Sequence, residues 1–246
     1  MNLSQSILLG IVQGLTEFLP VSSSGHLVIA QKLIGIPSNI TFDVAVHLST
    51  LLAVILYFWK DLFMIISHFF KGLRKIAFNK EFFRSIYYSD TNFKIAILII
   101  VGTAPTALIG LILKSQFEKL FNSILAVGFF FILTGIIILI AEWIGKGERR
   151  EYQLNIIDAL IIGTAQGAAI APGLSRMGTT ISAALSLNLE RRIAAKFSFL
   201  LSAIAILGAG ILKAGDLIEI GSTGIGLISL ILGSVASALT GYLVIK

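Results

Sequence analysis

The chain has 246 residues, of which 56% are hydrophobic and only 13% are charged, and its mean hydropathy is +0.94. Soluble domains carry about a quarter charged residues, so this composition excludes an ordinary soluble protein and predicts one compact all-α membrane domain over residues 1–246. The net charge of +6 does not indicate a nucleic-acid partner, because the basic residues lie in short segments between apolar runs, as in membrane proteins.

Apolar runs long enough to cross a bilayer occur throughout the chain after its first forty residues. A spanning helix needs about 20 predominantly apolar residues. The sequence predicts spans over residues 42–59, 95–113, 124–144, 197–212 and 225–245, of which the fourth is slightly short.

Four further apolar segments, at 3–18, 27–36, 156–170 and 179–189, are too short or too interrupted to be full spans. They form two pairs, and each pair is joined across a break rich in proline, glycine and serine. Two short arms around such a break predict a re-entrant hairpin, whose irregular backbone must be buried in protein or line a wet cavity.

The two hairpin regions resemble each other at a constant offset of 153 residues. The matched pairs are Gly10 with Gly163, Gln13 with Gln166, Gly14 with Gly167, Ser22 with Ser175 and Gly25 with Gly178. These identities indicate an internal duplication, with one repeat over about 1–150 and the other over about 151–246. A hairpin followed by three spans would invert the second repeat, and we expect that repeat to lack its last helix. Paired broken segments in inverted halves point to a site near the bilayer midplane.

The lysines and arginines predict the orientation. Fourteen of them fall on one side of the predicted topology, in the segments 60–94, 146–150 and 191–196 and at Lys246. Four fall on the other, namely Lys32, Lys114, Lys119 and Lys213. We therefore expect a multi-pass plasma-membrane protein whose richly basic side is cytoplasmic and whose first hairpin enters from the outer face. Residues 71–84, basic and rich in phenylalanine, are expected to form an amphipathic cytoplasmic surface element at anionic headgroups.

The first hairpin contains QGLTEFLPVSSSGH, in which Glu17, a cluster of three serines and His26 lie within ten residues. Polar and ionisable groups are costly in a chain this apolar, so they are candidates for chemistry. Since the chain has no cysteine, thiolate chemistry and cysteine-ligated metals are excluded.

The second hairpin contains PGLSRMGTT, where Arg176 is the one arginine outside the basic segments. Its rigid fork of donors matches phosphate oxygens. Each tip leads into a helix N-terminus, where free backbone N–H groups favour anions. Tips that meet would therefore form a positive pocket suited to a diphosphate, to which nearby hydroxyls would add donors, from Ser23, Ser24, Ser175, Thr179 and Thr180.

Structural explanations compete with each of these assignments. The three serines could be helix N-caps, Arg176 could form a structural ion pair with Glu17, and His26 could be a satisfied buried histidine. Asp43 and His47, four residues apart, form a second polar pair with a structural or an accessory role. Glu142, Asp158 and Glu190 lie near segment ends, where a charge can reach the interface, and we assign them no role in chemistry.

The two motifs resemble the signatures of the undecaprenyl pyrophosphate phosphatase family, the bacitracin-resistance type. The segments FDVAVHLSTLLAVILYFW, GTAPTALIG, FSFLLSAIAILGAG and GYLVIK are also similar to that family, so the resemblance covers essentially the whole chain. It implies an integral membrane enzyme that hydrolyses a polyprenyl diphosphate to the monophosphate with the help of a divalent cation. That reaction regenerates the lipid carrier of cell-wall glycans and confers bacitracin resistance.

Carried over by position, the resemblance makes Glu17, Ser23, His26 and Arg176 catalytic. Glu17 and Gln13 would hold Mg²⁺ or Ca²⁺, and the substrate would bind at the two tips, through Ser24, Gly25, Gly173, Ser175, Thr179 and Thr180. Three departures from the family pattern are Met177 at a usual serine, Ser49 at a common glycine, and an end at Lys246 where one more helix is usual.

Two functions remain at this point. The first is phosphoryl transfer from the lipid diphosphate to a nucleophile that His26 activates, either water or Ser23. The alternative is a transporter of polyprenyl phosphate or anions that uses the same inverted-repeat pocket. The sequence leaves open whether the protein is a homodimer.

Overall fold

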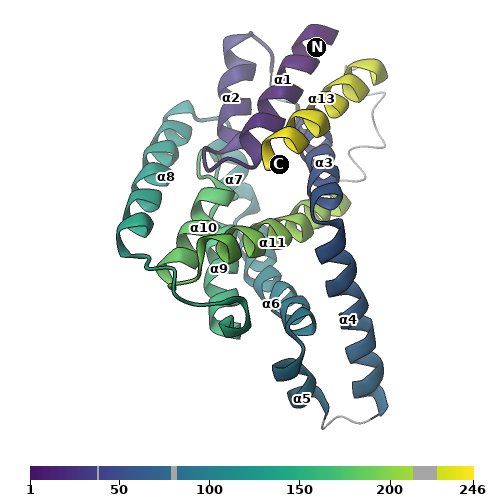
Figure 1. Cartoon of the computed structure of the whole chain (residues 1–246). Coiled ribbons are helices and arrows are strands. Elements are labelled where there is room, and N and C mark those ends of the chain that lie inside the picture. Colours follow the sequence, from purple (N-terminus) through teal and green to yellow (C-terminus); the bar gives the residue numbers. More distant parts are fainter. Residues whose placement is uncertain (38, 79–81, 213–225) are drawn as a thin grey trace.

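The computed structural model describes residues 1–37, 39–78, 82–212 and 226–246 (Figure 1). The described residues form helices and no named strand, which confirms the all-α prediction. The helices are α1 (Leu3–Glu17), α2 (Ser23–Leu33), α3 (Ile40–Tyr57), α4 (Trp59–Phe78), α5 (Phe82–Ser89), α6 (Thr91–Ile112), α7 (Lys114–Phe121), α8 (Ile124–Ile144), the 3₁₀ turn η1 (Glu151–Gln153), α9 (Ile156–Ala168), α10 (Arg176–Ser186), α11 (Arg191–Leu212) and α13 (Leu227–Ile245).

Four of these helices, α6, α8, α11 and α13, are long and apolar enough to cross a bilayer. The bounds of α8 match the predicted span, whereas α11 begins six residues earlier than predicted, at Arg191. Its first turns therefore carry the charges of Arg191, Arg192 and Lys196 into the membrane interface. The predicted start of the last span at residue 225, and Lys213, lie outside the described residues.

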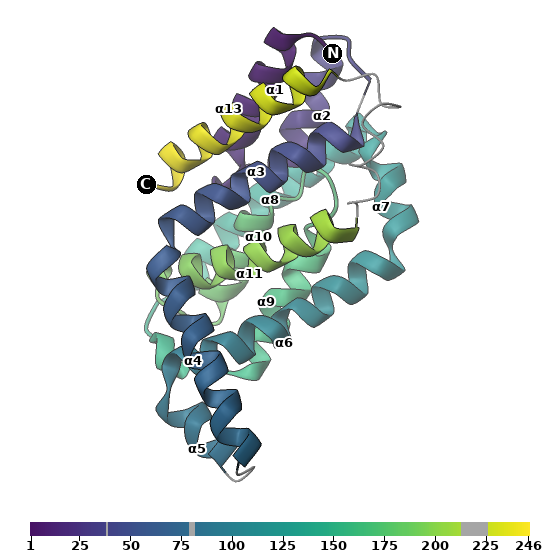
Figure 2. The ribbon, with the colours of Figure 1, turned by 90° about the vertical axis from the view of Figure 1, so that its right-hand side faces the viewer.

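The predicted span 42–59 covers most of α3 and the first residue of α4, and these two helices form a bent pair. Helix α3 ends at Tyr57, and α4 leaves it at an angle of 82°. Because α4 carries Lys60, Asp61 and four further basic or histidine side chains, hydrocarbon does not suit it, and α3 alone is the apolar arm of the pair. Figure 2 shows α4 running across the direction of α3, α6 and α11.

Both predicted hairpins are present as pairs of short helices. Helices α1 and α9 have 15 and 13 residues, and their partners α2 and α10 have 11 each, so none reaches the length of an ordinary span. The second arms begin three or four residues earlier than predicted, because Ser22 and Ser175 cap them: the hydroxyl of each accepts a hydrogen bond from the N–H three residues on.

The two halves run in opposite directions, as the inverted repeat predicts. In Figure 2, α3 and α11 lie side by side with opposite chain directions, and α6 and α13 are likewise opposed. The hairpins are exchanged between the halves: α1 packs along α13 of the second half, and α9 packs along α6 of the first. Each half of the chain therefore packs against a hairpin of the other half.

Glycines make both exchanged contacts possible. A Cβ on Gly10 would lie 2.1 Å from the Gly233 carbonyl oxygen, and one on Gly163 would lie 1.9 Å from the Gly102 carbonyl oxygen. Gly102 and Gly233 lie 131 residues apart in the two repeats. The same offset matches two further pairs of small residues, Thr106 with Ser237 and Gly110 with Gly241. Small residues let helix backbones approach closely in a membrane, where van der Waals contact is the main attraction between helices.

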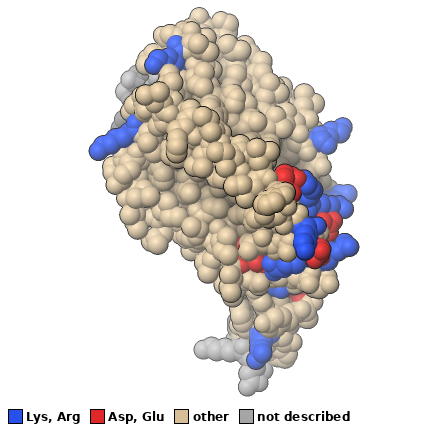
Figure 3. All heavy atoms as spheres, turned by 90° about the vertical axis from the view of Figure 1, so that its left-hand side faces the viewer, with Lys and Arg blue, Asp and Glu red and all other residues tan. Residues whose placement is uncertain are grey.

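The surface of the bundle is apolar. Large side chains such as Leu125 and Trp143 are 87% and 88% exposed, which suits contact with lipid. Figure 3 shows one face that is largely free of charge, with most of its basic and acidic residues gathered at the right-hand edge of the view. The contacts of Lys196 with Asp61 and Glu151 place the starts of α4, η1 and α11 together at the basic end. Lys32 lies with Phe121 and Asn122 at another hollow, beside α7.

Candidate active site at the two hairpin tips

Glu17 is the last residue of α1 and its side chain is only 3% exposed. Its Oε2 accepts hydrogen bonds from Gln13 Nε2, at 2.8 Å, and from the Ser23 hydroxyl, at 2.5 Å. Gln13 lies one helical turn before Glu17, and Ser23 opens α2, so the break in the hairpin brings the serine back onto the carboxylate. Short hydrogen bonds to an ionised carboxylate are the strong ones. Glu17 and Ser23 therefore act as one unit.

The first tip is strained at Ser22, whose φ of 67° is in the left-handed region. Such a conformation costs about 1–3 kcal/mol in a residue other than glycine, and it persists only where the surroundings hold it. Here the Ser22 hydroxyl caps α2, and the Ser22 carbonyl lies 2.8 Å from His26 Nδ1. The Ser22 hydroxyl also lies 3.4 Å from that of Ser24. The strained backbone at Ser22 thus places its carbonyl where it holds the His26 imidazole by a hydrogen bond.

The hydrogen bond of His26 to the Ser22 carbonyl determines which ring nitrogen can act as a base. A carbonyl oxygen can only accept, so Nδ1 carries the hydrogen and, in the neutral ring, Nε2 keeps a lone pair. The edge of the ring packs against Phe131 of α8, with the ring centroids 5.1 Å apart. His26 is therefore held as a base at Nε2. Its hydrogen bond goes to Ser22 and not to Ser23.

The second tip is anchored by Gly173, Ser175 and Thr134 of α8. Gly173 has a φ of +95°, and a Cβ there would lie 2.4 Å from the Val127 carbonyl oxygen, so the position requires glycine. The Thr134 hydroxyl donates to the Gly173 carbonyl and accepts from the Ser175 N–H. This tie holds the start of α10 in place against α8.

Two predicted substrate ligands on α10, Thr179 and Thr180, are buried and engaged with the backbone. Their hydroxyls donate to the carbonyls of Ser175 and Arg176, at 2.7 and 2.8 Å. A substrate oxygen could take these hydrogens only if the hydroxyls turned away from the backbone. Their role in binding stays a prediction.

The two tips meet, as the positive-pocket hypothesis requires. A Cβ on Gly25 would lie 2.9 Å from the Gly173 Cα, so these glycines allow the tips to touch. Across the contact, Arg176 Nη1 lies 3.6 Å from Glu17 Oε1. This Nη1 is buried and makes no hydrogen bond among the described residues. The ion pair considered from sequence is thus present, but it leaves an arginine donor unused.

A third element contributes His47 from α3. Its Nε2 lies 3.6 Å from Glu17 Oε2, and its Nδ1 lies 2.7 Å from the Asp43 carbonyl oxygen. Asp43 in turn accepts a hydrogen bond from Gln31 of α2. The polar pair seen in the sequence therefore borders the site and links it to α3.

The three acids near segment ends, Glu142, Asp158 and Glu190, form ion pairs with arginines away from the tips. Asp158 is buried and receives two hydrogen bonds from Arg149, while Glu190 pairs with Arg150 and Glu142 pairs with Arg191. These pairs join the connection between α8 and α9 to the starts of α9 and α11, away from the tips.

The donor set at Glu17 fits a hard cation only in part. In the described part of the chain no cluster of three or more His, Cys, Asp or Glu residues could hold a metal ion. Glu17 supplies one carboxylate, and the buried Gln13 Oε1 has no hydrogen-bond partner there. Mg²⁺ and Ca²⁺ take such oxygens and complete their coordination with phosphate and water. The residues thus fit a cation that is shared with a phosphorylated substrate.

Thr134 is the site residue that the sequence analysis missed. Its only signal is a single hydroxyl within the apolar run FFFILTGIII, and many such threonines donate to their own helix. Only the packing of α8 on α10 shows that its hydroxyl serves the tip.

Comparison with known proteins identifies the family of this chain. A family model described as bacitracin resistance protein BacA matches residues 6–246. A relative from Methanobrevibacter smithii is 40% identical over 247 residues, covering 100% of this chain and 88% of the relative. Another, from Carboxydothermus hydrogenoformans, is 44% identical over 249 residues, covering 100% of this chain and 87% of the relative. Both bear the name undecaprenyl-diphosphatase.

Proposed function

This chain belongs to the bacitracin resistance protein BacA family, and from that premise we propose how its hairpin tips hydrolyse undecaprenyl diphosphate. The products are undecaprenyl monophosphate and inorganic phosphate, so the reaction recycles the lipid carrier for cell-wall glycans. The observation that carries the proposal is the unused, buried Nη1 of Arg176 beside the Glu17–Ser23 pair.

Arg176 and two helix N-termini bind the diphosphate. Arginine matches phosphate geometry, and the first turns of α2 and α10 offer backbone N–H groups and positive dipole ends at the same place. Phosphoryl transfer depends mainly on positioning and on neutralising charge on the phosphoryl oxygens. Two N-termini and one guanidinium provide that positive field at the contact of the tips.

The Glu17–Ser23 hydrogen bond favours Ser23 as the nucleophile. In this route Ser23 Oγ attacks the terminal phosphorus, the bond from that phosphorus to the bridging oxygen breaks, and the lipid monophosphate leaves. The hydroxyl proton passes to Glu17, which already accepts it in a 2.5 Å hydrogen bond.

His26 serves the water that completes the reaction. Its Nε2 lone pair takes a proton from the water that attacks the phosphoserine phosphorus, and the bond from that phosphorus to Ser23 Oγ breaks. Inorganic phosphate leaves, and Glu17 returns its proton to the Ser23 oxygen. A direct attack by water on the diphosphate would use the same base and would bypass the phosphoserine. The two routes differ in whether a phosphoenzyme forms.

Glu17 and Gln13 would hold the divalent cation, Mg²⁺ or Ca²⁺. The cation would add positive charge for the diphosphate oxygens. The orphaned Gln13 Oε1 and the Glu17 carboxylate are the oxygens that support this assignment.

We place the site toward the outer face of the plasma membrane. The start of α4, the end of α8 and the start of α11 lie together among basic residues, and the positive-inside rule makes that end cytoplasmic. The absence of native cysteine allows a direct test with single-cysteine variants in intact cells. A membrane-impermeant maleimide should label Lys114→Cys, on α7, and not Lys75→Cys, on α4. The reverse pattern would overturn this orientation.

The function itself is tested with the purified chain and undecaprenyl diphosphate in detergent. Thin-layer chromatography of the lipid should show the monophosphate, matched by an equal amount of inorganic phosphate. Saturable binding of the lipid with no phosphate release would instead favour a carrier.

A further inference from the structure

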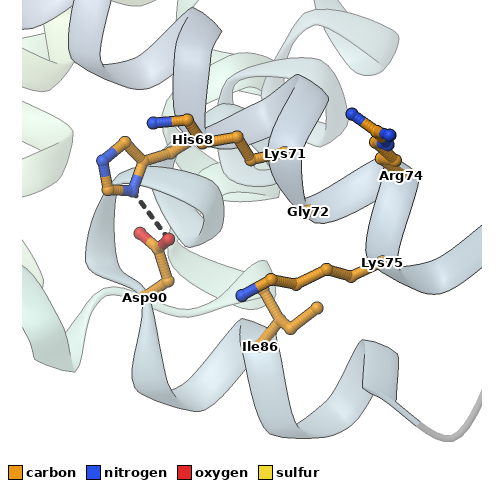
Figure 4. A pocket seen from close by; sticks show the side chains of 7 residues that line it. All are labelled: His68, Lys71, Gly72, Arg74, Lys75, Ile86 and Asp90. Carbon is orange, nitrogen blue, oxygen red and sulfur yellow. Dashed lines mark hydrogen bonds and ion pairs between the residues drawn. The ribbon is translucent and has the colours of Figure 1, made fainter.

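A hollow of about 460 Å³ lies between α4 and α5, away from the hairpin tips (Figure 4). Gly72 is part of its lining, at the point where α4 comes close to α6. A Cβ at Gly72 would lie only 2.3 Å from the Phe93 ring, so this approach depends on the glycine. Ile86 of α5 closes one wall. The phosphatase chemistry described above makes no use of this hollow.

The lining is strongly basic. Lys71, Arg74 and Lys75 of α4 line the hollow, and none of the ion pairs among the described residues involves them. Figure 4 shows the amino groups of Lys71 and Lys75 directed toward the same side, where His68 and Asp90 lie. The two lysines therefore direct their charges to one side of the hollow, whereas the Arg74 guanidinium points away from them, and neither lysine has an ion-pair partner among the described residues.

The one acid in the lining, Asp90, is already engaged. It accepts hydrogen bonds from His68 Nδ1, at 2.7 Å, and from the Phe93 N–H, at 3.1 Å. Burial raises the pKa of the Asp90 carboxyl, but the hydrogen bonds from Phe93 and His68 lower it more, so the pKa lies below its usual value. Asp90 orients His68 and caps α6, and it does not neutralise the lysines.

The apolar side chains of α4 indicate where this hollow lies. Phe63, Ile66, Phe70 and Leu73 recur at helical spacing and are all exposed, on a different side of the helix from His68, Lys71 and Lys75. Helix α4 is bent by 82° from the apolar α3, so α4 would lie along the surface of a bilayer that α3 enters. Helices of this kind bury the apolar stripe at the boundary of headgroups and acyl chains. The basic hollow is then at the level of lipid phosphates.

We propose that the hollow between α4 and α5 binds the phosphate headgroup of an anionic phospholipid in the cytoplasmic leaflet. Lys71 and Lys75 neutralise the phosphodiester, and the exposed apolar residues of α4 contact the acyl chains. Charge complementarity and the position of α4 at the interface favour a lipid over a free anion. The site is independent of the reaction at Glu17.

The full chain in detergent is titrated with dioctanoyl phosphatidylglycerol, and binding is measured by native mass spectrometry and by thermal shift. Dioctanoyl phosphatidylcholine and inorganic phosphate are the comparison probes. We expect saturable binding of phosphatidylglycerol, with Kd about tenfold weaker for the other two probes, since each basic residue near a membrane surface adds a sizeable attraction.

Matched variants locate the site. Lys71→Gln with Lys75→Gln should weaken phosphatidylglycerol binding about tenfold, whereas Lys114→Gln with Lys119→Gln, which removes the same charge on α7, should not. The charge-preserving Lys71→Arg with Lys75→Arg should bind normally, which separates lost charge from lost folding. Arg176→Ala should also bind normally, which separates the hollow from the tips. Equal loss in the α7 variant, equal binding of phosphatidylcholine, or equally tight binding of inorganic phosphate would overturn the proposal.

Discussion

Arg176 Nη1 and Glu17 Oε1 lie 3.6 Å apart across the contact of two hairpins whose first helices begin at Leu3 and Ile156. The charges are close enough to attract, yet the arginine nitrogen makes no hydrogen bond within the described part of the chain. A buried donor without a partner is costly unless a ligand completes it. In the proposed function the completing ligand is the diphosphate of the substrate, and the exchanged packing of the repeats brings the two halves of its site together.

Glu17 and Ser23 should behave as one catalytic unit. We expect Glu17→Gln and Ser23→Ala each to lower kcat about 100-fold or more, and the double variant to be little worse than either, because removing one member already disables the pair. Ser49→Ala is the matched control, since the Ser49 hydroxyl donates only within α3, to the Ala45 carbonyl. Multiplicative losses in the double variant would show that the two residues act separately.

His26 should control the second half of the reaction. If Ser23 is the nucleophile and His26 activates water, His26→Ala should accumulate phosphoserine, because the hydrolytic step slows more than the attack. The measurement is acid quenching with substrate labelled in the terminal phosphate, followed by detection of label on the protein. Ser23→Ala should carry no label. An unlabelled but inactive His26→Ala enzyme would instead support direct attack by water.

Gln13 should set the demand for a divalent cation. EDTA should abolish activity and added Mg²⁺ or Ca²⁺ should restore it. Gln13→Leu should need a higher free cation concentration, because it removes the unpartnered Oε1, and Gln13→Glu should need less, because it adds a carboxylate. Half-maximal cation concentrations from activity titrations give the comparison. Identical values in all three proteins would exclude Gln13 from the cation site.

The exchanged packing of the hairpins should depend on its glycines. Gly163→Ala places a Cβ 1.9 Å from the Gly102 carbonyl oxygen, so α9 and α6 must separate. Overpacking of this kind costs about 1–3 kcal/mol, and we expect the Tm in detergent to fall by at least about 4 °C. A Cβ at Gly128 meets nothing within 4 Å, so Gly128→Ala should leave the Tm unchanged or raise it. Equal Tm values for both variants would contradict the packing described.

The sequence predicted the hairpins and their tips well, because proline, glycine and serine breaks inside apolar runs constrain the backbone locally. The 153-residue offset also predicted the inverted repeat. It matches Gly10 with Gly163, and each of these glycines lets a hairpin helix approach a helix of the other half closely. Ser23, Ser24 and Ser175 were predicted as hydroxyl donors, with helix capping as the alternative for Ser22 to Ser24, and the structure shows that Ser22 and Ser175 cap helices.

Contacts between helices that are distant in the chain could not be predicted from the sequence. Helical periodicity shows that α3 carries Asp43 and His47 on one face, but only the assembled bundle shows that His47 reaches Glu17. The same holds for Thr134, whose hydroxyl could have bonded its own helix, and for the 82° bend after Tyr57. An apolar run that continues through Phe58 and Trp59 gives no sign of a turn, because a bend between two helices depends on what each packs against.

The meeting of the two tips at one diphosphate is tested most directly by Arg176→Ala, with phosphate release from undecaprenyl diphosphate as the readout. Arg150→Ala is the matched control, because Arg150 pairs with Glu190 in an exposed ion pair of the kind that contributes little. We predict that Arg176→Ala lowers kcat/KM about 100-fold or more while Arg150→Ala stays near the wild-type value. Near-normal phosphate release by a folded Arg176→Ala chain would contradict the account, since the second hairpin would then contribute nothing to the reaction.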